Sequence, residues 1–358
     1  MNEQTTGALT SETARVIRQQ LSAISEDVVT DIYGENPADW KPYGSSGRKK
    51  SVRDVGYHLT YLAEALEASD LTLFTEYVAW AKVLFAGLDL PEDVLPTTLH
   101  RIQVSLEKAL PPEMWNAVAP YLEAGFERSE QAPAQLPSLL SKDAPLGALA
   151  QDYLDALLQG QRHLASQLIM DAVNEGTSIK KIYLNVFQPV QREVGRLWQQ
   201  NQVSVAQEHY CTAATQLIMS QLYPKIFNMT RSDQRLVATC VGGELHEIGV
   251  RMVADFFEME GWDTYYLGSN TPASSILQTI EEQNADVLAI SATIPYHVSK
   301  VAALIENVRT TFTDDQINIL VGGYPFNTSP DLWQRVGADG FAPNAQEAIA
   351  LANKMTTR

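Results

Sequence analysis

Cysteine is scarce in this sequence of 358 residues: there are two, Cys211 and Cys240, far apart and outside any Cys-x-x-Cys pair. This scarcity excludes a disulfide scaffold and a cysteine zinc cluster, and it fits a reducing cytoplasm. Basic residues are also few, with 26 Lys and Arg against 43 Asp and Glu and a formal net charge of −17. Because phosphate contacts need a basic face, direct binding of nucleic acid is not expected.

Long apolar runs are missing as well. No window reaches the ~18 uninterrupted apolar residues of a membrane span, and the N-terminal stretch MNEQTTGALTSETARV has neither the basic nor the apolar segment of a secretory signal. Hydrophobic residues nevertheless make up 45% of the chain and charged residues 19%, which is typical of folded domains. We therefore expect a soluble, acidic, cytoplasmic protein with no membrane contact and room for several domains.

The sequence pattern changes along the chain from helical to α/β. Residues 1–128 and 147–228 place apolar residues at helical spacing, and the second range contains four helical runs, which predicts a four-helix bundle. Between them, residues 129–146 contain three prolines among small polar residues, as in a linker. Over residues 235–358, short β-rich runs such as RLVATCVGG and ADVLAISA alternate with helical runs. This alternation predicts a doubly wound parallel sheet of about five strands, and hence an α + α/β fold class overall.

The loop after the first β-rich run contains the first candidates for chemistry. Residues 242–249 read Gly-Gly-Glu-Leu-His-Glu-Ile-Gly, and ligands of parallel sheets bind at the carboxyl ends of the strands. A histidine there can bind a metal, while a carboxylate two residues before it fixes the tautomer of the ring. Gly249 lets the chain turn into a helix with no side chain facing a bulky ligand. The local pattern alone leaves open an ordinary loop histidine.

Three motifs follow one another at a defined spacing. Glu244-x-His246-x-x-Gly249 is followed after 41 residues by Ser291-Ala292-Thr293, and after a further 28 residues by Gly322-Gly323. This arrangement resembles the Asp-x-His-x-x-Gly, Ser-x-Leu and Gly-Gly motifs of the cobalamin-binding domain of methionine synthase, the corrinoid methyltransferases and the cobalamin-dependent mutases. The sequence departs from the pattern twice, because Glu244 stands for Asp and Thr293 stands for Leu.

The resemblance implies a Rossmann-like, flavodoxin-like domain that binds cobalamin with its own base displaced. The dimethylbenzimidazole tail would enter a slot between the strands, and His246 would replace it as the lower axial ligand of cobalt. Gly322 and Gly323 would leave room for the tail, and Ser291 would form a hydrogen bond to it. The other residues expected at the cofactor are Glu244, Leu245, Ile248, Gly249 and Thr293.

A second pattern lies in the bundle, where Trp198 is followed after nine residues by Glu208-His209. It resembles the light-sensing branch of the family, the cobalamin-dependent repressors of carotenoid genes. The resemblance implies that Trp198 shields 5′-deoxyadenosylcobalamin, that Glu208 contacts the adenosyl group, and that His209 becomes the upper cobalt ligand after light breaks the Co–C bond. The alternative is a core tryptophan and a surface Glu-His pair.

The N-terminal block has a pattern that would suit a linear tetrapyrrole, with Arg53, His58, Tyr61 and Trp80 as candidate ligand contacts. It resembles the N-terminal region of photocobilins, which join a cobalamin domain to a bilin such as biliverdin. Since neither cysteine lies in this block, the resemblance implies a non-covalent bilin. The alternative is that these residues are core and boundary positions of a dimerising helical domain.

These patterns leave three functions open. The first is an adenosylcobalamin-dependent photoreceptor, with or without biliverdin, that is not an enzyme and signals as a homo-oligomer, preferably a dimer, through a separate effector protein. The alternative is a corrinoid methyl-carrier protein of a methyltransferase system, and the third is a light-independent cobalamin store or sensor. No Walker loop or nucleophile elbow is present, so no separate catalytic domain is expected.

Overall fold

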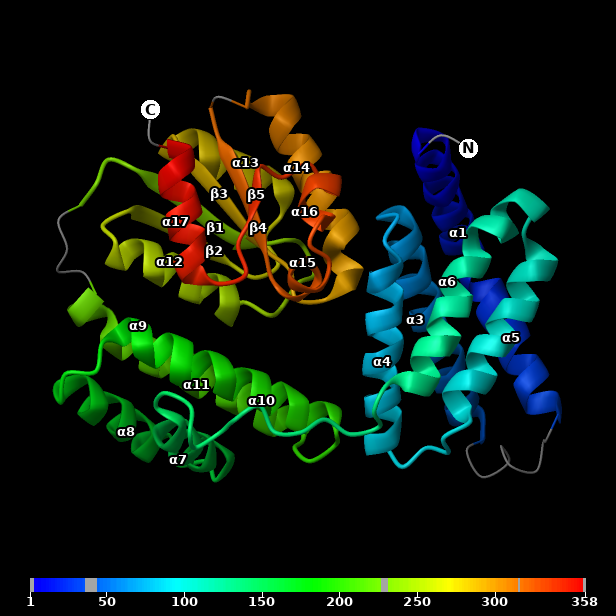
Figure 1. The fold of residues 1–358 in the computed structure, drawn as a ribbon, viewed down its shortest axis with the longest axis horizontal. Coiled ribbons are helices and arrows are strands. Elements are labelled where there is room, and N and C mark those ends of the chain that lie inside the picture. Colours follow the sequence, from blue (N-terminus) through cyan, green and yellow to red (C-terminus); the bar gives the residue numbers. More distant parts are fainter. Residues whose placement is uncertain (1–2, 36–43, 227–230, 315, 357–358) are drawn as a thin grey trace. The chain divides into compact units, whose positions relative to one another are not determined.

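The structure is a computed structural model that describes residues 3–35, 44–226, 231–314 and 316–356. Its contacts divide the chain into two compact units. The first comprises Met1–Ala134, Ile294–Ala302 and Tyr324–Val336, and the second comprises Gln135–Thr293, Ala303–Gly323 and Gly337–Arg358. The predicted fold class is confirmed, because N-terminal helices are followed by further helices and by a five-stranded parallel sheet (Figure 1).

Long helices build the N-terminal part of the first unit. Within the described residues they are α1 (Glu3–Glu35), α3 (Gly44–Glu67), α4 (Leu71–Gly87), α5 (Val94–Ala109) and α6 (Pro112–Gln131). On α3, Leu59, Leu62 and Leu66 recur at helical spacing and are fully buried. Gly125 of α6 lies against α4, since a Cβ at this position would be 2.6 Å from Cε1 of Phe74. Close packing of helices therefore forms the core of this unit.

Asp70 fixes the turn between α3 and α4. Its side chain accepts a hydrogen bond from the N–H of Thr72 at 3.0 Å, which caps the first turn of α4. The same carboxylate forms an ion pair with Arg335 at 3.1 Å. This pair joins the α3–α4 turn to the later segments of the first unit, which contain η3 (Pro295–His297), the start of α14 (Val298–Thr311), α15 (Tyr324–Thr328) and α16 (Leu332–Arg335).

The second unit contains the parallel sheet, with strand order β2-β1-β3-β4-β5. The strands are β1 (Arg235–Cys240), β2 (Asp263–Gly268), β3 (Val287–Ser291), β4 (Asn318–Gly322) and β5 (Gly340–Phe341). The order reverses between β1 and β3, as in flavodoxin-like folds, whose ligands bind outside the carboxyl ends of the strands at that point. Cys240 pairs with Ser291, and Ser291 pairs with Gly322. The strand register therefore brings the ends of β1, β3 and β4 to one level.

Helices cover both faces of this sheet (Figure 1). In the second unit, α12 (Ile248–Met259) and α17 (Ala345–Thr356) pack against each other, and α13 (Ala273–Gln283) packs against β1. Strands β1, β3 and β4 are almost continuously buried, which explains why they read as apolar runs in the sequence, whereas β2 is mostly half-buried.

The predicted bundle lies beside α12 in the same unit (Figure 1). It consists of α7 (Gly147–Leu158), α8 (Arg162–Asn174), α9 (Ile179–Ile182), the π-helical turn η2 (Tyr183–Phe187), α10 (Gln188–Gln199) and α11 (Val205–Ile226). One apolar core runs from buried bundle residues such as Phe187 and Leu222 through Phe256 of α12 to the sheet. The bundle helices α7 to α11 thus share one apolar core with the sheet.

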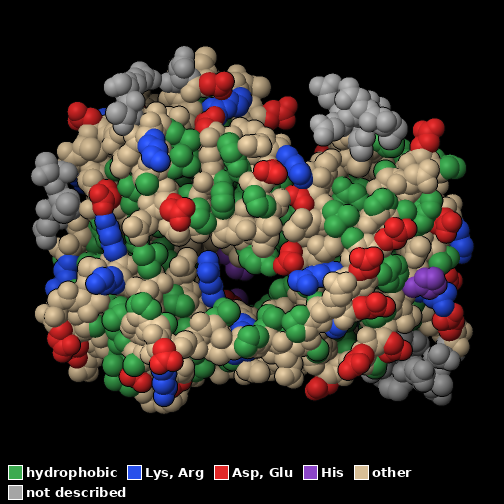
Figure 2. All heavy atoms as spheres, in the orientation of Figure 1, with side chains coloured by type: hydrophobic (Ala, Val, Ile, Leu, Met, Phe, Trp, Pro, Cys, Tyr) green, Lys and Arg blue, Asp and Glu red, His purple; other side chains and the backbone are tan. Residues whose placement is uncertain are grey.

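The surface agrees with the acidic composition. Red carboxylate side chains are spread among Lys and Arg over the face drawn in Figure 2. No helix among the described residues has both the length and the apolar character needed to cross a membrane.

Candidate functional site

The loop between β1 and α12 holds His246 against a buried carboxylate. Glu244 is fully buried, and its Oε1 lies 2.6 Å from Nδ1 of His246 and accepts the backbone N–H of the same residue at 3.0 Å. Its Oε2 accepts the backbone N–H of Thr293, after β3, at 2.8 Å. The carboxylate therefore orients the imidazole with Nδ1 as the donor, so the lone pair resides on Nε2.

The ring of His246 remains accessible, since its side chain is 52% exposed while that of Glu244 is 0% exposed. The hydrogen bond that His246 donates to Glu244 raises the pKa of His246 above its ordinary value, burial opposes the rise, and the negative charges of Glu244 and Glu208 add to it. A half-exposed imidazole with one nitrogen fixed by a carboxylate is a typical metal ligand. The predicted pairing of Glu244 with His246 is thus present in the structure.

Glycines allow the backbone segments at the neighbouring strand ends to approach one another closely. Gly323 has a φ of +107°, and a Cβ there would lie 1.9 Å from the carbonyl oxygen of Ala292, so no other residue fits without moving the backbone. At Gly322 a Cβ would lie 3.1 Å from the carbonyl oxygen of Ala342. A Cβ on Gly249 would be 3.9 Å from Oγ of Ser291. The second motif therefore contacts both the first and the third, and their donor set and cradle fit a cobalamin tail and its lower ligand.

Two other predicted residues frame this loop. Leu245 is 71% exposed at its tip, and Ile248 begins α12 and packs partly against the apolar core. Thr293 contributes its backbone N–H to Glu244, a role that its side chain does not reveal in the sequence. The longer Glu244 spans from the histidine to the end of β3, which gives a physical reason for the departure from Asp.

The bundle residues lie on two consecutive helices. Trp198 is near the end of α10 and is partly buried, while Glu208 and His209 lie near the start of α11. Nε2 of His209 is 3.4 Å from the carboxylate of Glu208, and the His209 side chain is 75% exposed. His209 is therefore a surface residue that pairs with its neighbour in the sequence.

The N-terminal candidates gather around Tyr77. His58 is buried with Nδ1 2.9 Å from the hydroxyl of Tyr77, and Tyr61 stacks on Tyr77 at 3.8 Å between ring centroids. Trp80 stacks on the same ring at 6.3 Å, whereas Arg53 is 62% exposed beside Asp54. Burial lowers the pKa of His58 to about 4. The structure brings three of the four predicted residues together and leaves Arg53 at the surface.

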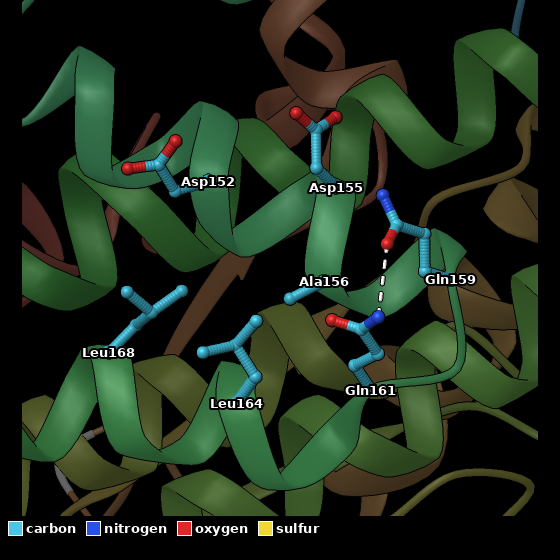
Figure 3. Close-up of a pocket in the computed structure, with 7 residues that line it drawn as sticks. All are labelled: Asp152, Asp155, Ala156, Gln159, Gln161, Leu164 and Leu168. Carbon is cyan, nitrogen blue, oxygen red and sulfur yellow. Dashed lines mark hydrogen bonds between the residues drawn. The ribbon is translucent and has the colours of Figure 1, made fainter.

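A separate groove of about 280 Å³ lies between α7 and α8 (Figure 3). It is lined by Asp152, Asp155, Ala156, Gln159, Gln161, Leu164 and Leu168. None of the residues predicted to bind a cofactor is among these seven.

Sequence reasoning missed three residues that support the loop. Asn270 follows β2, and its Oδ1 accepts the N–H of Gly243 at 2.7 Å. Glu247 accepts a hydrogen bond from Gln216 of α11 at 2.8 Å. A carboxylate directly after the histidine was a visible signal for Glu247, but nothing local in the sequence indicates its partner.

Comparison with protein families supports a corrinoid cofactor. Residues 234–350 match a family described as B12 binding domain, and residues 149–223 match a second family with the same description. The sheet and most of the preceding bundle thus each match a family described as B12 binding domain. These matches support a cobalamin or corrinoid cofactor without specifying its upper ligand.

Individual relatives point to corrinoid proteins. A corrinoid protein of Desulfitobacterium hafniense (strain Y51) is 26% identical over 212 residues, which make up 58% of this chain and 97% of that protein. The dimethylamine corrinoid protein of Methanosarcina barkeri is 29% identical over 121 residues, 34% of this chain and about half, 55%, of that protein. The structure of the monomethylamine corrinoid protein of Methanosarcina barkeri has a TM-score of 0.53 and 20% identity over 59% of this chain and 100% of that chain. This last likeness shows the shared fold.

The expectation of a cobalamin-dependent photoreceptor is wrong. The relatives are corrinoid proteins, two of them named for methylated amines, which agrees with the alternative function. The expectation rested on a short Trp-x9-Glu-His pattern, and the structure leaves His209 mostly exposed and paired with Glu208. The comparisons lend no support to biliverdin as a second chromophore.

Proposed function

We propose that this chain is a corrinoid protein that carries a methyl group between methyltransferases. The observation that carries the proposal is the buried Glu244 carboxylate bound to His246 at the carboxyl end of β1, inside a segment that matches a B12 binding domain. The names of the dimethylamine and monomethylamine relatives support a methylated amine as the source of the methyl group. The chain is then a carrier rather than an enzyme, and its partners are proteins that donate and accept the methyl group.

The residues of the chain have separable tasks in this function. Glu244 keeps Nδ1 of His246 as a donor, which leaves Nε2 as the atom that would hold the cobalt of a corrinoid. Gly323 lets the backbone pass close to Ala292, where the nucleotide tail of the cofactor would lie. When bound, the corrinoid supplies the cobalt that accepts and releases the methyl group.

Cofactor binding and methyl carriage are tested in that order. The purified chain is mixed with hydroxocobalamin, and retention through gel filtration is followed by absorbance. Wild-type protein and His209→Ala should retain the cofactor equally, whereas His246→Ala should lose it. Loss in His209→Ala would show that a residue of α11 is a required ligand and would contradict the proposed site.

Methyl carriage is then measured on the reduced, loaded chain. Corrinoid methyltransferases are supplied with mono-, di- or trimethylamine, and the conversion of the bound cofactor is followed by its absorption spectrum. We expect conversion with at least one amine and no conversion in His246→Ala. Tight cofactor binding without conversion by any of the three would favour a cobalamin store instead.

A further inference from the structure

Helices α11 and α12 meet along a regular line of polar contacts, which we call the α11–α12 polar ladder. The contacts recur at positions i, i+4 and i+7 on α11, and at i, i+4 and i+8 counted from Glu247, the residue directly before α12, so each set occupies one helix face. The rungs are Gln216 Nε2 to Glu247 Oε1 at 2.8 Å, Arg251 Nη2 to Ser220 Oγ at 2.7 Å, and Tyr223 Oη to Asp255 Oδ1 at 3.1 Å.

Glu247 of the first rung also binds the end of β2, whereas Asp255 of the third rung also binds Tyr183 of η2. Oε2 of Glu247 accepts the hydroxyl of Tyr266 at 3.2 Å and the backbone N–H of Ser269 at 3.1 Å, both at the end of β2. Gly268, with a φ of +76°, makes room for this carboxylate, since a Cβ there would lie 3.2 Å from Oε2. One side chain therefore joins α11, the start of α12 and the end of β2.

The position of this rung connects the His246 loop to α11. Glu247 directly follows His246 in the chain, and Gln216 lies eight residues after Glu208 on α11, about 12 Å along the helix. The hydrogen bond between Gln216 and Glu247 thus links the loop that contains His246 to α11, the helix that carries Glu208 and His209 near its start. The second and third rungs lie farther along both helices, away from His246.

We propose that Glu247 is a positioning residue for the cofactor, and this proposal rests on the proposed function. It holds the His246 loop against α11 and the end of β2, so that His246 stays in the geometry that the cofactor needs. When the rung is lost, the shared apolar core keeps the bundle on the sheet, but the loop gains freedom. The cofactor then binds less tightly and dissociates faster, because a freer loop loses more conformational entropy when it holds His246 in the binding conformation.

The test compares substitutions at the first rung with a matched substitution at the second. In Glu247→Gln the charge is lost and Gln216 must turn its amide over to accept the new amide nitrogen, so the charged hydrogen bonds that hold the loop become weaker neutral ones. Gln216→Leu removes the same hydrogen bond from the α11 side. The double variant loses only this one contact, so its effect should not exceed that of a single variant. Ser220→Ala is the control, because it breaks a neighbouring contact between the same helices.

Two readouts are used, the Kd for hydroxocobalamin and the nitrogen splitting in the EPR spectrum of the chain loaded with cob(II)alamin, which reports histidine ligation. We expect both single variants to raise Kd by about 10- to 100-fold and to reduce the histidine-ligated fraction. The double variant should be no worse than either single variant, and Ser220→Ala should stay within about twofold of wild type.

The outcomes separate the two proposals. Wild-type binding in both Glu247→Gln and Gln216→Leu would overturn the positioning role and leave the corrinoid function intact. An equal loss in Ser220→Ala would also overturn it, because the whole helix contact would then be responsible. Failure of the wild-type chain to bind hydroxocobalamin would overturn both proposals.

Discussion

His58 in the first unit and His246 in the second have opposite environments. His58 is 3% exposed, its Nδ1 lies against the neutral hydroxyl of Tyr77, and burial lowers its pKa to about 4. The side chain of His246 is 52% exposed, its Nδ1 lies against the Glu244 carboxylate, and that hydrogen bond raises its pKa. One is a neutral core residue and the other is oriented as a ligand.

The difference teaches that the partner of a histidine indicates its role more clearly than the histidine itself. A buried, charged carboxylate is costly unless hydrogen bonds compensate it, so a fold retains one where its charge has a use. Glu244 is compensated by the N–H groups of His246 and Thr293 and by the imidazole. The contact of His58 with Tyr77 needs no such compensation, and aromatic packing alone accounts for it.

The largest effects are expected when each of the two histidines is replaced by alanine. His246→Ala should weaken cobalamin binding by about 100-fold or more, equivalent to about 2.7 kcal/mol, with little change in the stability of the chain without cofactor. His58→Ala should leave a buried cavity and destabilise the first unit by about 3 kcal/mol, with cobalamin affinity unchanged. Equilibrium unfolding in urea and titration with hydroxocobalamin measure the two quantities.

The comparison would fail if either variant changed both quantities to a similar extent. A loss of cobalamin affinity in His58→Ala would mean that the first unit contributes to the cofactor site. His163→Ala offers a control, since it removes an exposed histidine of α8 and should change neither quantity.

The next effect is on the pH dependence of stability, which should have opposite signs in the two units. His58 stays neutral when folded, so its contribution is complete above its unfolded pKa near 6.5 and falls as the pH drops toward 4, by about 3 kcal/mol. In the second unit, burial raises the pKa of Asp255 to about 6 although Tyr183 and Tyr223 donate to it. Its folded form prefers the proton, so stability falls by about 3 kcal/mol as the pH rises from about 4 to 6.

Unfolding curves between pH 4 and 7 check these slopes when they are recorded for variants that lack each group. His58→Gln should remove the loss of stability on acidification, and Asp255→Asn should remove the loss on raising the pH. If His58→Gln lowered stability by the same amount at every pH, His58 would not cause the loss on acidification. The same result for Asp255→Asn would exclude Asp255 as the cause of the loss on raising the pH.

Much of the fold follows from sequence periodicity, while the contacts that complete the site do not. Alternating β and α runs predict the parallel sheet, and the motif spacing predicts that His246, Ser291 and Gly323 meet at one edge, which the register of β1, β3 and β4 explains. The rung between Gln216 and Glu247 joins residues 31 positions apart on different elements, and no local pattern indicates it. The contribution of Thr293 comes from its backbone, which its side-chain identity does not encode.

The error about light sensing has a similar physical origin. Trp198, Glu208 and His209 have residue types suited to an upper cofactor face, but the sequence gives neither exposure nor partners. In the structure His209 is 75% exposed and pairs with Glu208, an arrangement common in the first turns of a surface helix. A motif of three residues is weaker evidence than three motifs in register.

A smaller effect is expected when the charge of the Glu244 partner is removed while its shape is kept. In Glu244→Gln the amide nitrogen must face either His246 or Thr293, both of which donate to the carboxylate. Cobalamin affinity should fall by about tenfold, since the ring is still held but less firmly. Titration with hydroxocobalamin measures this, and Glu244→Asp provides the control, with the carboxylate kept but its reach shortened. Full affinity in Glu244→Gln would show that shape alone orients His246.

The smallest effect is expected from the matching change at His58. Tyr77→Phe keeps the ring that stacks on Tyr61 but removes the hydroxyl that lies 2.9 Å from Nδ1 of His58. The loss leaves one buried ring nitrogen without this partner and should cost about 1 kcal/mol of stability in urea unfolding. Cobalamin affinity should not change, in contrast to Glu244→Gln. If Tyr77→Phe weakened cobalamin binding as much as Glu244→Gln, the neutral pair would share the role of the charged one, and the distinction between the two histidines would be lost.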